Sequence, residues 1–428
     1  MTPAESSAGY LGSKRYAHYV FALLFLIYMF DYIDRLVVVS LFPFLQQEWG
    51  LSDTQCGLLV SAVYWSILTF TLPVSVLVDR WSRKKSIGLM AVLWCAATAA
   101  CAFTKSFPQL FAARTAIGIG EAGYAPGGTA MIAAIYPEKK RAAVMGIWNA
   151  SIPLGSALGI ALGGWIAQTW GWRHAFGIVA LPGLIIAVLF FFIKDYKTVD
   201  LRRTDASGNV RRAGYFEILK GFGHTPSLIL TYLAFAGNVF VTTALLSWLP
   251  TFFHRVEGLP MAQAGTKGSA VMLLSMIGAP LGGFLADKWQ KKRGNARPLI
   301  CALTSAITAG ALLLTFAVLK GGAQYATLLV VGVAAAAFVP AGAAITQDVV
   351  HPGVRATSYS FCVIVQHLLG SSMGPLFVGY VSDRTDISTA LAILPVFALI
   401  AALLFLGAAF FYEKDLAKVE KIDVAMEP

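Results

Sequence analysis

The sequence predicts an all-α polytopic membrane protein with twelve transmembrane helices in two six-helix bundles. Of its 428 residues, 57% are hydrophobic and only 13% are charged, which is too little charge for the surface of a soluble domain of this length. The apolar residues also occur in blocks of about 20, the helix length that crosses a bilayer core. Alternating segments of about ten residues, typical of a membrane β-barrel, are absent from the sequence, so we expect helical spans.

The apolar blocks place twelve spans along the chain. They are residues 16–44, 54–78, 85–105, 108–136, 141–168, 173–194, 226–252, 262–286, 297–319, 323–347, 356–382 and 387–412. We expect no cleavable signal peptide, because residues 1–13 are mostly polar or small and the next apolar segment is long enough to span by itself. The five cysteines are scattered through apolar segments without metal or redox spacing, so we interpret them as packing residues and predict no metal or cofactor.

Basic residues predict the orientation of the spans. With the N-terminus and alternate loops in the cytoplasm, only six of the 33 lysines and arginines fall in the opposite loops: Lys105, Arg173, Arg255, Lys267, Lys320 and Arg384. Because cytoplasmic loops carry such an excess of basic residues, we expect a multi-pass inner-membrane protein with both termini cytoplasmic. The net charge of +11 then reflects topology and requires no nucleic acid, and the basic loops also suit contact with anionic lipids.

A long polar interval divides the predicted spans into two halves. Residues 195–225 are expected to form a cytoplasmic linker between an N-terminal bundle (1–194) and a C-terminal bundle (226–412), with a cytoplasmic tail at 413–428. A repeat supports this division. The segment SVLVDRWSRKK (75–85) corresponds to GFLADKWQKKR (283–293), so that Asp79 and Asp287 occupy matching positions.

Five charged residues lie inside the predicted spans, where each costs roughly 2.5 to 3.5 kcal/mol on insertion scales and therefore needs a partner or water. Asp31, Asp34 and Arg35 belong to the first span, and Arg114 and Glu121 belong to the fourth. Their formal charge is minus one, which permits two ion pairs and leaves one carboxylate over. Burial beside like charge favours proton uptake by that carboxylate, which predicts a proton-coupled cycle.

These charges lead to a specific hypothesis about the site. Asp34 and Glu121 are the predicted protonatable pair, and Asp31 is expected to be a supporting or rim residue. Arg35 and Arg114 are predicted to alternate between pairing with the acids and binding an anionic head group through their bidentate guanidinium groups. The alternative is a permanent ion-pair network that only fixes helix packing. Other candidates for lining a cavity are Tyr32, Trp65, Tyr124, Trp148, Asn149, Asn238, Gln366 and His367.

The segment 75–85 resembles the cytoplasmic signature G-x-x-x-D-R-x-G-R-K of the major facilitator superfamily, with serines at 75 and 82 replacing the two glycines. The resemblance implies two bundles that rock about a central cavity, and a charged latch that stabilises the outward-facing state. The matching latch residues are Asp79, Arg80, Arg83 and Lys84, with Asp287 in the second half.

Four further motifs look like the Spinster family of lysolipid and sphingosine-phosphate transporters. They are DYIDR (31–35), RTAIGIGEA (114–122), IPLGSALG (152–159) and HLLGSSMGP (367–375). This resemblance implies a secondary transporter of an amphipathic anionic lipid. A neighbouring family, the anion:cation symporters for sugar acids and other carboxylates, shares the Asp-Arg pair and the arginine seven residues before a glutamate, and is the alternative.

Signals for other classes of protein are weak. The sequence has no P-loop, and GIGEAG (118–123) lies inside an apolar span rather than after a strand, so neither an ATP-driven pump nor a dinucleotide site is expected. An intramembrane enzyme would need a dyad or metal ligands, and we predict none. A non-transporting membrane sensor is the alternative from another class, and an added soluble domain would be its distinguishing feature. We expect a monomer whose partners are its substrate, protons and membrane lipids.

Overall fold

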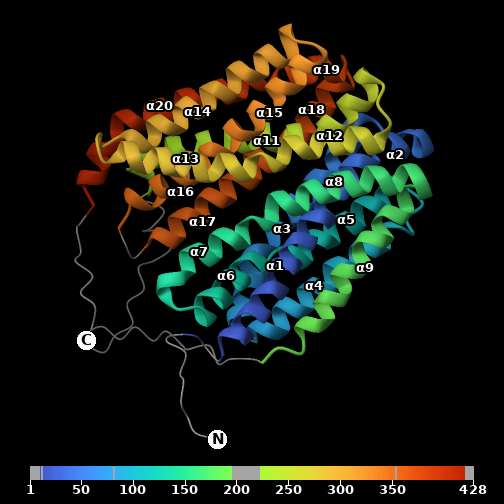
Figure 1. Ribbon diagram of the computed structural model, residues 1–428, viewed down its shortest axis with the longest axis horizontal. Helices are drawn as coiled ribbons and strands as arrows, with labels where there is room; N and C mark the ends of the chain where they lie inside the picture. The colour runs from blue at the N-terminus through green and yellow to red at the C-terminus, as the bar shows by residue number, and fades with distance from the viewer. Residues whose placement is uncertain (1–9, 11–12, 81, 195–221, 352–353, 420–428) are drawn as a thin grey trace, which may run out of the picture. The chain divides into compact units, whose positions relative to one another are not determined.

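The computed structural model describes residues 10, 13–80, 82–194, 222–351 and 354–419. All the secondary structure of these residues is helical (Figure 1). Ten of the described helical segments are long and apolar enough to cross a membrane. The prediction of an all-helical, multi-pass membrane protein is therefore confirmed, whereas most of the predicted linker lies outside the described residues.

The predicted spans of the first half correspond to one or more helices each. These helices are α1 (Lys14–Leu36), η1 (Val37–Leu41), α2 (Phe42–Trp49), α3 (Asp53–Arg80), α4 (Arg83–Cys101), α5 (Phe107–Glu121), α6 (Tyr124–Ile135), α7 (Glu138–Asn149), α8 (Ser151–Trp170) and α9 (Trp172–Phe190). The first span changes from α-helix to the 3-10 helix η1, and the fourth span is divided into α5 and α6. Pro126 explains the division, because its missing N–H cannot bond the carbonyl of Ala122 four residues earlier.

The predicted spans of the second half are divided in the same manner. Its helices are α11 (Pro226–Glu257), α12 (Met261–Leu273), α13 (Ser275–Gln290), α14 (Ala296–Leu313), η2 (Leu314–Val318), α15 (Gly321–Ala337), α16 (Val339–Asp348), α17 (Arg355–Val365), η4 (Gln366–Ser371), α18 (Met373–Ser382), α19 (Ile387–Ala392) and α20 (Leu394–Ala417). Both η2 and η4 are short π-helices.

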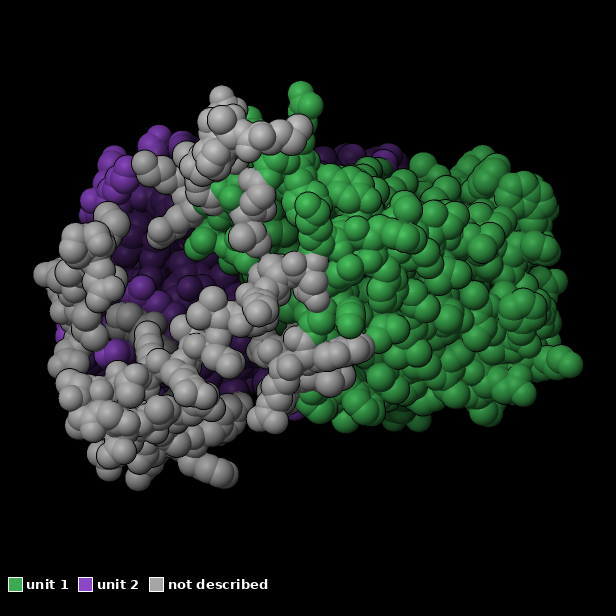
Figure 2. All heavy atoms as spheres, turned by 90° about the horizontal axis from the view of Figure 1, so that it is seen from below, with its two compact units in different colours: residues 1–197, 244–273, 375–390 green, residues 198–243, 274–374, 391–428 purple. Residues whose placement is uncertain are grey.

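The chain forms two compact units that differ from the two predicted halves (Figure 2). Unit 1 comprises residues 1–197, 244–273 and 375–390, and unit 2 comprises residues 198–243, 274–374 and 391–428. Unit 1 therefore contains the first-half helices together with the end of α11, all of α12 and most of α18. The predicted bundle boundaries stay a prediction.

Small residues let the helices of unit 1 approach at backbone distance. The central helix α1 packs against α8 and α9, and α5 packs against α3 and α4. A Cβ atom on Gly159 of α8 would lie 2.7 Å from the carbonyl oxygen of Ile33, and one on Gly163 would lie 2.8 Å from that of Val37. Glycine is therefore required at both positions, and it fixes α8 beside the charged end of α1.

Unit 2 has its own apolar core. Helix α14 packs against α15 and α20, and α13 packs against α15. Aromatic side chains of α11, the α15–α16 junction and α20 meet there, with the rings of Phe235 and Phe338 4.8 Å apart and those of Phe338 and Phe405 6.0 Å apart. All five cysteines of the chain, Cys56, Cys95, Cys101, Cys301 and Cys362, are buried free thiols, as packing residues should be.

Candidate functional site

Arg35 is the centre of the buried charges in unit 1. Its Nη2 donates to Asp31 Oδ2 at 3.0 Å and to Glu121 Oε2 at 2.8 Å. Asp31 lies one helical turn before Arg35 on α1, and Glu121 is the last residue of α5. The exposed fractions of Asp31, Arg35 and Glu121 are 1%, 5% and 5%. A single guanidinium nitrogen therefore serves two buried carboxylates.

Arg114 of α5 is fully buried and bonds to backbone carbonyl groups. Its guanidinium donates to the carbonyl oxygens of Leu59 (3.1 Å), Asp34 (3.0 Å) and Arg35 (2.8 Å). The last two carbonyls lie at the C-terminal end of α1, which carries the negative end of the helix dipole and lacks helical donors. The end of α1 thus supplies acceptors for Arg114 in this conformation, and the alternation of Arg114 between an acid and a head group stays a prediction.

Asp34 also differs from its predicted arrangement. Its carboxylate is completely buried and forms no ion pair with Arg35 or Arg114. The Cys95 thiol of α4 lies 3.9 Å from Asp34 Oδ2, and Oδ1 has no hydrogen-bond partner among the residues that the structure describes. Asp31, expected to be a supporting or rim residue, lies beside Arg35. The roles of these residues in proton coupling and substrate binding stay predictions.

Aromatic rings surround one side of the charged cluster. The ring of Tyr28 stacks on Trp148 at 4.4 Å and contacts Tyr32 and Tyr124 at 5.4 Å each. The Arg35 guanidinium carbon lies 4.5 Å from the centre of the Tyr32 ring and 5.4 Å from that of Tyr64. Tyr28 and Tyr64 were not among the predicted residues. The spacing of residues 28, 31, 32 and 35 along one face of a helix could have identified Tyr28.

The other predicted cavity residues are more dispersed. In unit 1, Trp65 is half-buried on α3 and Asn149 is exposed at the end of α7. In unit 2, the Asn238 amide donates to Ser305 Oγ at 2.8 Å. Gln366 lies 3.9 Å from the Cys362 sulfur, and His367 lies 3.2 Å from Ser371 Oγ. Each of these three unit 2 residues thus has a partner within its own unit.

The predicted latch residues are only partly described. Asp79 and Arg80 belong to the last turn of α3, but their side chains lie outside the described part of the structure. Arg83 and Lys84 open α4, where the Ser82 side chain caps the helix by accepting from the Lys85 N–H at 3.1 Å. In unit 2, the largely exposed Asp287 lies 3.4 Å from Arg297, which also bonds Asp348. The latch role stays a prediction.

A polar cluster that the sequence did not predict lies at one end of unit 1. Asp53, the first residue of α3, accepts hydrogen bonds from both terminal nitrogens of Arg255 at 2.8 and 2.6 Å. Gln46 and Ser382 each donate to the same carboxylate at 2.5 Å. We call Gln46, Asp53, Thr54, Arg255, Ser382 and Asp383 the Asp53 cluster. It joins residues of the predicted N-terminal half to residues of the predicted C-terminal half.

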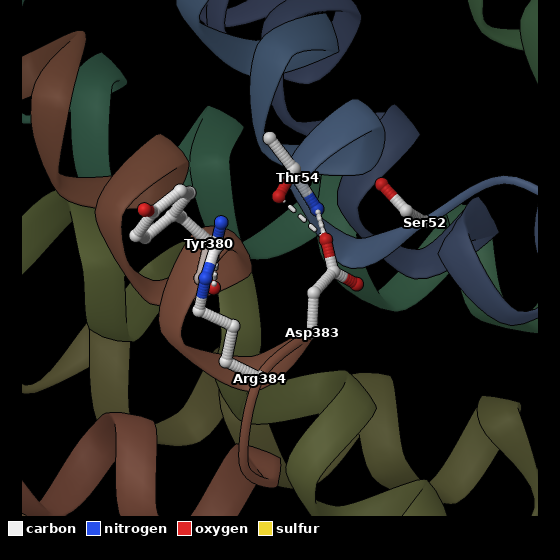
Figure 3. A pocket seen from close by; sticks show the side chains of 5 residues that line it. All are labelled: Ser52, Thr54, Tyr380, Asp383 and Arg384. Carbon is white, nitrogen blue, oxygen red and sulfur yellow. Dashed lines mark hydrogen bonds between the residues drawn. The ribbon is translucent and has the colours of Figure 1, made fainter.

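Asp383 extends this cluster to the N-terminus of α3. It accepts from the backbone N–H groups of Asp53 (2.7 Å) and Thr54 (2.8 Å) and from the Thr54 hydroxyl (2.5 Å), and Figure 3 shows it facing Thr54. Partial burial raises the pKa of Asp383, but the bonds from Thr54 and Asp53 outweigh it and leave that pKa below its usual value. An adjoining cavity of about 650 Å³ is lined by Ser52, Thr54, Tyr380, Asp383 and Arg384.

Two glycines of unit 1 allow first-half and second-half helices to pack closely. A Cβ atom on Gly57 of α3 would lie 2.5 Å from the carbonyl oxygen of Pro375 in α18, and one on Gly164 of α8 would lie 2.6 Å from that of Met261 in α12. Backbone therefore contacts backbone at two places where first-half and second-half helices meet. The resulting end of unit 1 is closed by packing as well as by charge.

Comparison with known proteins places this arrangement among membrane transporters. Residues 24–375 match the model of the major facilitator superfamily. The chain is 27% identical to the sphingosine-1-phosphate transporter of Xenopus tropicalis, over 93% of this chain and 82% of that protein. It is also 27% identical to the hexuronate transporter of Bacillus subtilis (strain 168), over 86% of this chain and 88% of that protein.

A solved structure has the same fold. A bacterial homologue of the human lysosomal transporter Spinster, in an inward-facing and occupied conformation, superimposes with a TM-score of 0.81 and 24% identity, over 94% of this chain and 99% of that chain. The superfamily match confirms the prediction of a transporter rather than an enzyme. The chain belongs to the major facilitator superfamily of membrane transporters, within which it resembles the Spinster family.

Proposed function

We propose that this chain is a proton-coupled transporter of an amphipathic anionic lipid, of the lysolipid or sphingoid-phosphate type. The observation that carries the proposal is the buried Arg35, whose guanidinium is shared by Asp31 and Glu121 inside the helical core of unit 1. A phosphate or carboxylate head group can replace one of these acids, because guanidinium binds both groups with the same forked geometry.

The aromatic rings beside Arg35 support an amphipathic substrate. The Tyr32 ring lies beside the guanidinium, Tyr28 contacts Tyr32, and Trp148 stacks on Tyr28. These rings present apolar surface near the charge. Such surface suits an alkyl tail, which has no hydrogen bonds to satisfy. The similarity to the sphingosine-1-phosphate transporter of Xenopus tropicalis points to the same class of substrate.

Proton coupling would act through the acids that surround Arg35. We assign proton uptake to Asp34 and Glu121. When Glu121 takes up a proton, its ion pair with Arg35 is lost, and an anionic head group then competes with Asp31 for the guanidinium. Binding of the substrate and of the proton would then favour each other, as coupled transport requires.

Alternating access would use the Asp53 cluster as a gate. The basic-residue pattern assigns both termini to the cytoplasm, so the Asp53 cluster would lie at the periplasmic side of an inner membrane. The bonds from Asp53 to Arg255 and from Thr54 to Asp383 join the two predicted halves there. These bonds would hold that end closed, and breaking them would be needed to open it.

A sugar acid or another small carboxylate is the second candidate substrate. The similarity to the hexuronate transporter of Bacillus subtilis favours it, and Arg35 would bind the carboxylate in the same way. The pocket would then need more polar lining than an alkyl tail requires.

Uptake into proteoliposomes under an imposed proton gradient separates the two candidates. The substrates to compare are sphingosine-1-phosphate, a lysophospholipid and glucuronate, with wild type, Glu121→Gln and the exposed control Glu48→Gln. Gradient-driven movement of a lipid that is lost in Glu121→Gln and retained in Glu48→Gln supports the proposal. Movement of glucuronate alone transfers it to the sugar-acid class, and uptake unaffected by Glu121→Gln removes Glu121 from the proton site.

A further inference from the structure

We infer that Asp31 and Glu121 form one carboxyl pair that holds a single proton between them, with Arg35 as their shared counter-ion. Asp31 is then a further residue of the coupling site rather than a supporting side chain. The functional meaning of this inference rests on the proposed proton coupling, but the protonation state itself can be measured without any transport.

The geometry shows one cation between two acids. The same nitrogen, Arg35 Nη2, contacts Asp31 Oδ2 and Glu121 Oε2. The second oxygens, Asp31 Oδ1 and Glu121 Oε1, are buried and have no hydrogen-bond partner in the described part of the chain. Because both acids meet at one NH₂ group, their carboxylates lie close together, and one guanidinium can compensate only one negative charge.

Among the described residues, only Arg35 pairs directly with these two acids. Arg114 is the other buried cation of these helices, and its guanidinium is bonded to three backbone carbonyls. Asp34 adds a further carboxylate rather than a counter-ion. The titratable and charged groups around Asp31 and Glu121 are Tyr28, Tyr32, Asp34 and Arg35 of α1, Tyr64 of α3, Cys95 of α4, Arg114 of α5 and Tyr124 of α6.

A shared proton resolves this imbalance. Two ionised acids beside one guanidinium would leave an uncompensated buried charge, which is among the most unfavourable arrangements in a protein interior. A proton on either acid removes that charge, and the protonated acid can donate a hydrogen bond to an oxygen of the other acid. If either acid were removed, the remaining one would form a simple ion pair with Arg35 and would need no proton.

Asp31 then has a role in substrate binding as well. An anionic head group must displace a carboxylate from Arg35, and Asp31 and Glu121 compete with it for the same nitrogen. A second proton would neutralise both acids and free the guanidinium entirely. Asp31 therefore raises the number of protons that must bind before Arg35 is fully available.

The inference predicts an infrared signature. In the purified protein in lipid nanodiscs, a protonated buried carboxyl gives a C=O stretching band that infrared difference spectroscopy follows during a pH titration. The measurement starts from Asp34→Asn, so that Asp34 contributes no band. We expect the band near neutral pH in this variant, its loss on adding Asp31→Asn, its loss on adding Glu121→Gln, and its retention on adding the control Glu48→Gln.

Isotope labelling tests the same point without a change at either acid. Carboxyl-labelled aspartate and carboxyl-labelled glutamate should each shift the band of Asp34→Asn, because the proton is shared. A band that survives Asp31→Asn or responds only to labelled glutamate overturns the inference, as does the absence of any band. Failure of lipid uptake would instead count against the proposed substrate and leave the infrared result unaffected.

Discussion

Replacing Arg255 by glutamine should open the end of unit 1 that carries the Asp53 cluster. In the present structure, Asp53 accepts two hydrogen bonds from Arg255 and one each from Gln46 and Ser382. Glutamine can restore at most one of the two lost bonds and none of the charge. Asp53, only 5% exposed, would then lie in a closed interface without a cation.

The size of the effect follows from burial. Breaking a buried ion pair costs about 3 to 5 kcal/mol. Because the Arg255 side chain is 32% exposed, solvent screens part of its interaction with Asp53, and the expected cost falls to about 2 to 3 kcal/mol. Since about 1.4 kcal/mol corresponds to a tenfold change in an equilibrium constant, the open population should rise roughly 30- to 150-fold.

Cys56 provides a natural reporter of this opening. It lies one turn after Asp53 on α3 and is fully buried. The rate at which a membrane-impermeant maleimide labels Cys56, read by peptide mass spectrometry, should rise by the same factor in Arg255→Gln. The matched control is Arg173→Gln, which breaks the pair with Glu48 between two first-half residues and should leave the rate unchanged. Equal Cys56 labelling in wild type and Arg255→Gln would refute the reasoning.

Three further predictions use the same structure. Gly57→Leu should raise Cys56 labelling at least as much as Arg255→Gln, because its Cβ would lie 2.5 Å from the Pro375 carbonyl oxygen; wild-type labelling would contradict this. Arg114→Lys should lower the unfolding free energy by about 2 to 4 kcal/mol, because lysine cannot reach all three carbonyls, and an unchanged thermal midpoint would count against it. The pKa of Asp383 is lowered, so its stabilisation is present above its unfolded value of about 3.9 and is lost as pH falls through the lower folded value. Asp383→Ala should therefore reduce the thermal midpoint by more at neutral pH than at pH 3, and a constant difference would argue otherwise.

The fold could be predicted because span length is a local property of the sequence. Blocks of about 20 apolar residues suffice to predict helical spans, whatever those helices later contact. The change from α1 to η1 was not predicted; it lies beside two carbonyls that Arg114 bonds from another helix, and such a contact leaves no local pattern in the sequence. The break between α5 and α6 was readable in principle from Pro126, whose effect is also local.

The site was predicted only where charge and spacing decide it. Asp31 and Arg35 are one helical turn apart in the sequence, a spacing that puts them on one face of a helix, and they do pair. Counting formal charges paired Arg114 with an acid, because such a count ignores the backbone carbonyls at a helix end. The Asp53 cluster was missed since its members are far apart in sequence, although Arg255 was one of only six basic residues predicted opposite the cytoplasm.

Three carboxylates and two guanidinium groups give the buried residues of α1 and α5 a formal charge of minus one when every acid is ionised. While Asp34 stays ionised, a proton shared by Asp31 and Glu121 would bring this charge to zero, and a second proton together with a monoanionic substrate would leave it at zero. A neutral site crosses the membrane field without electrical work, whereas each uncompensated charge would exchange about 2.3 kcal/mol per 100 mV. Under the proposed coupling, transport would then be driven by the pH difference across the membrane and would be insensitive to the membrane potential.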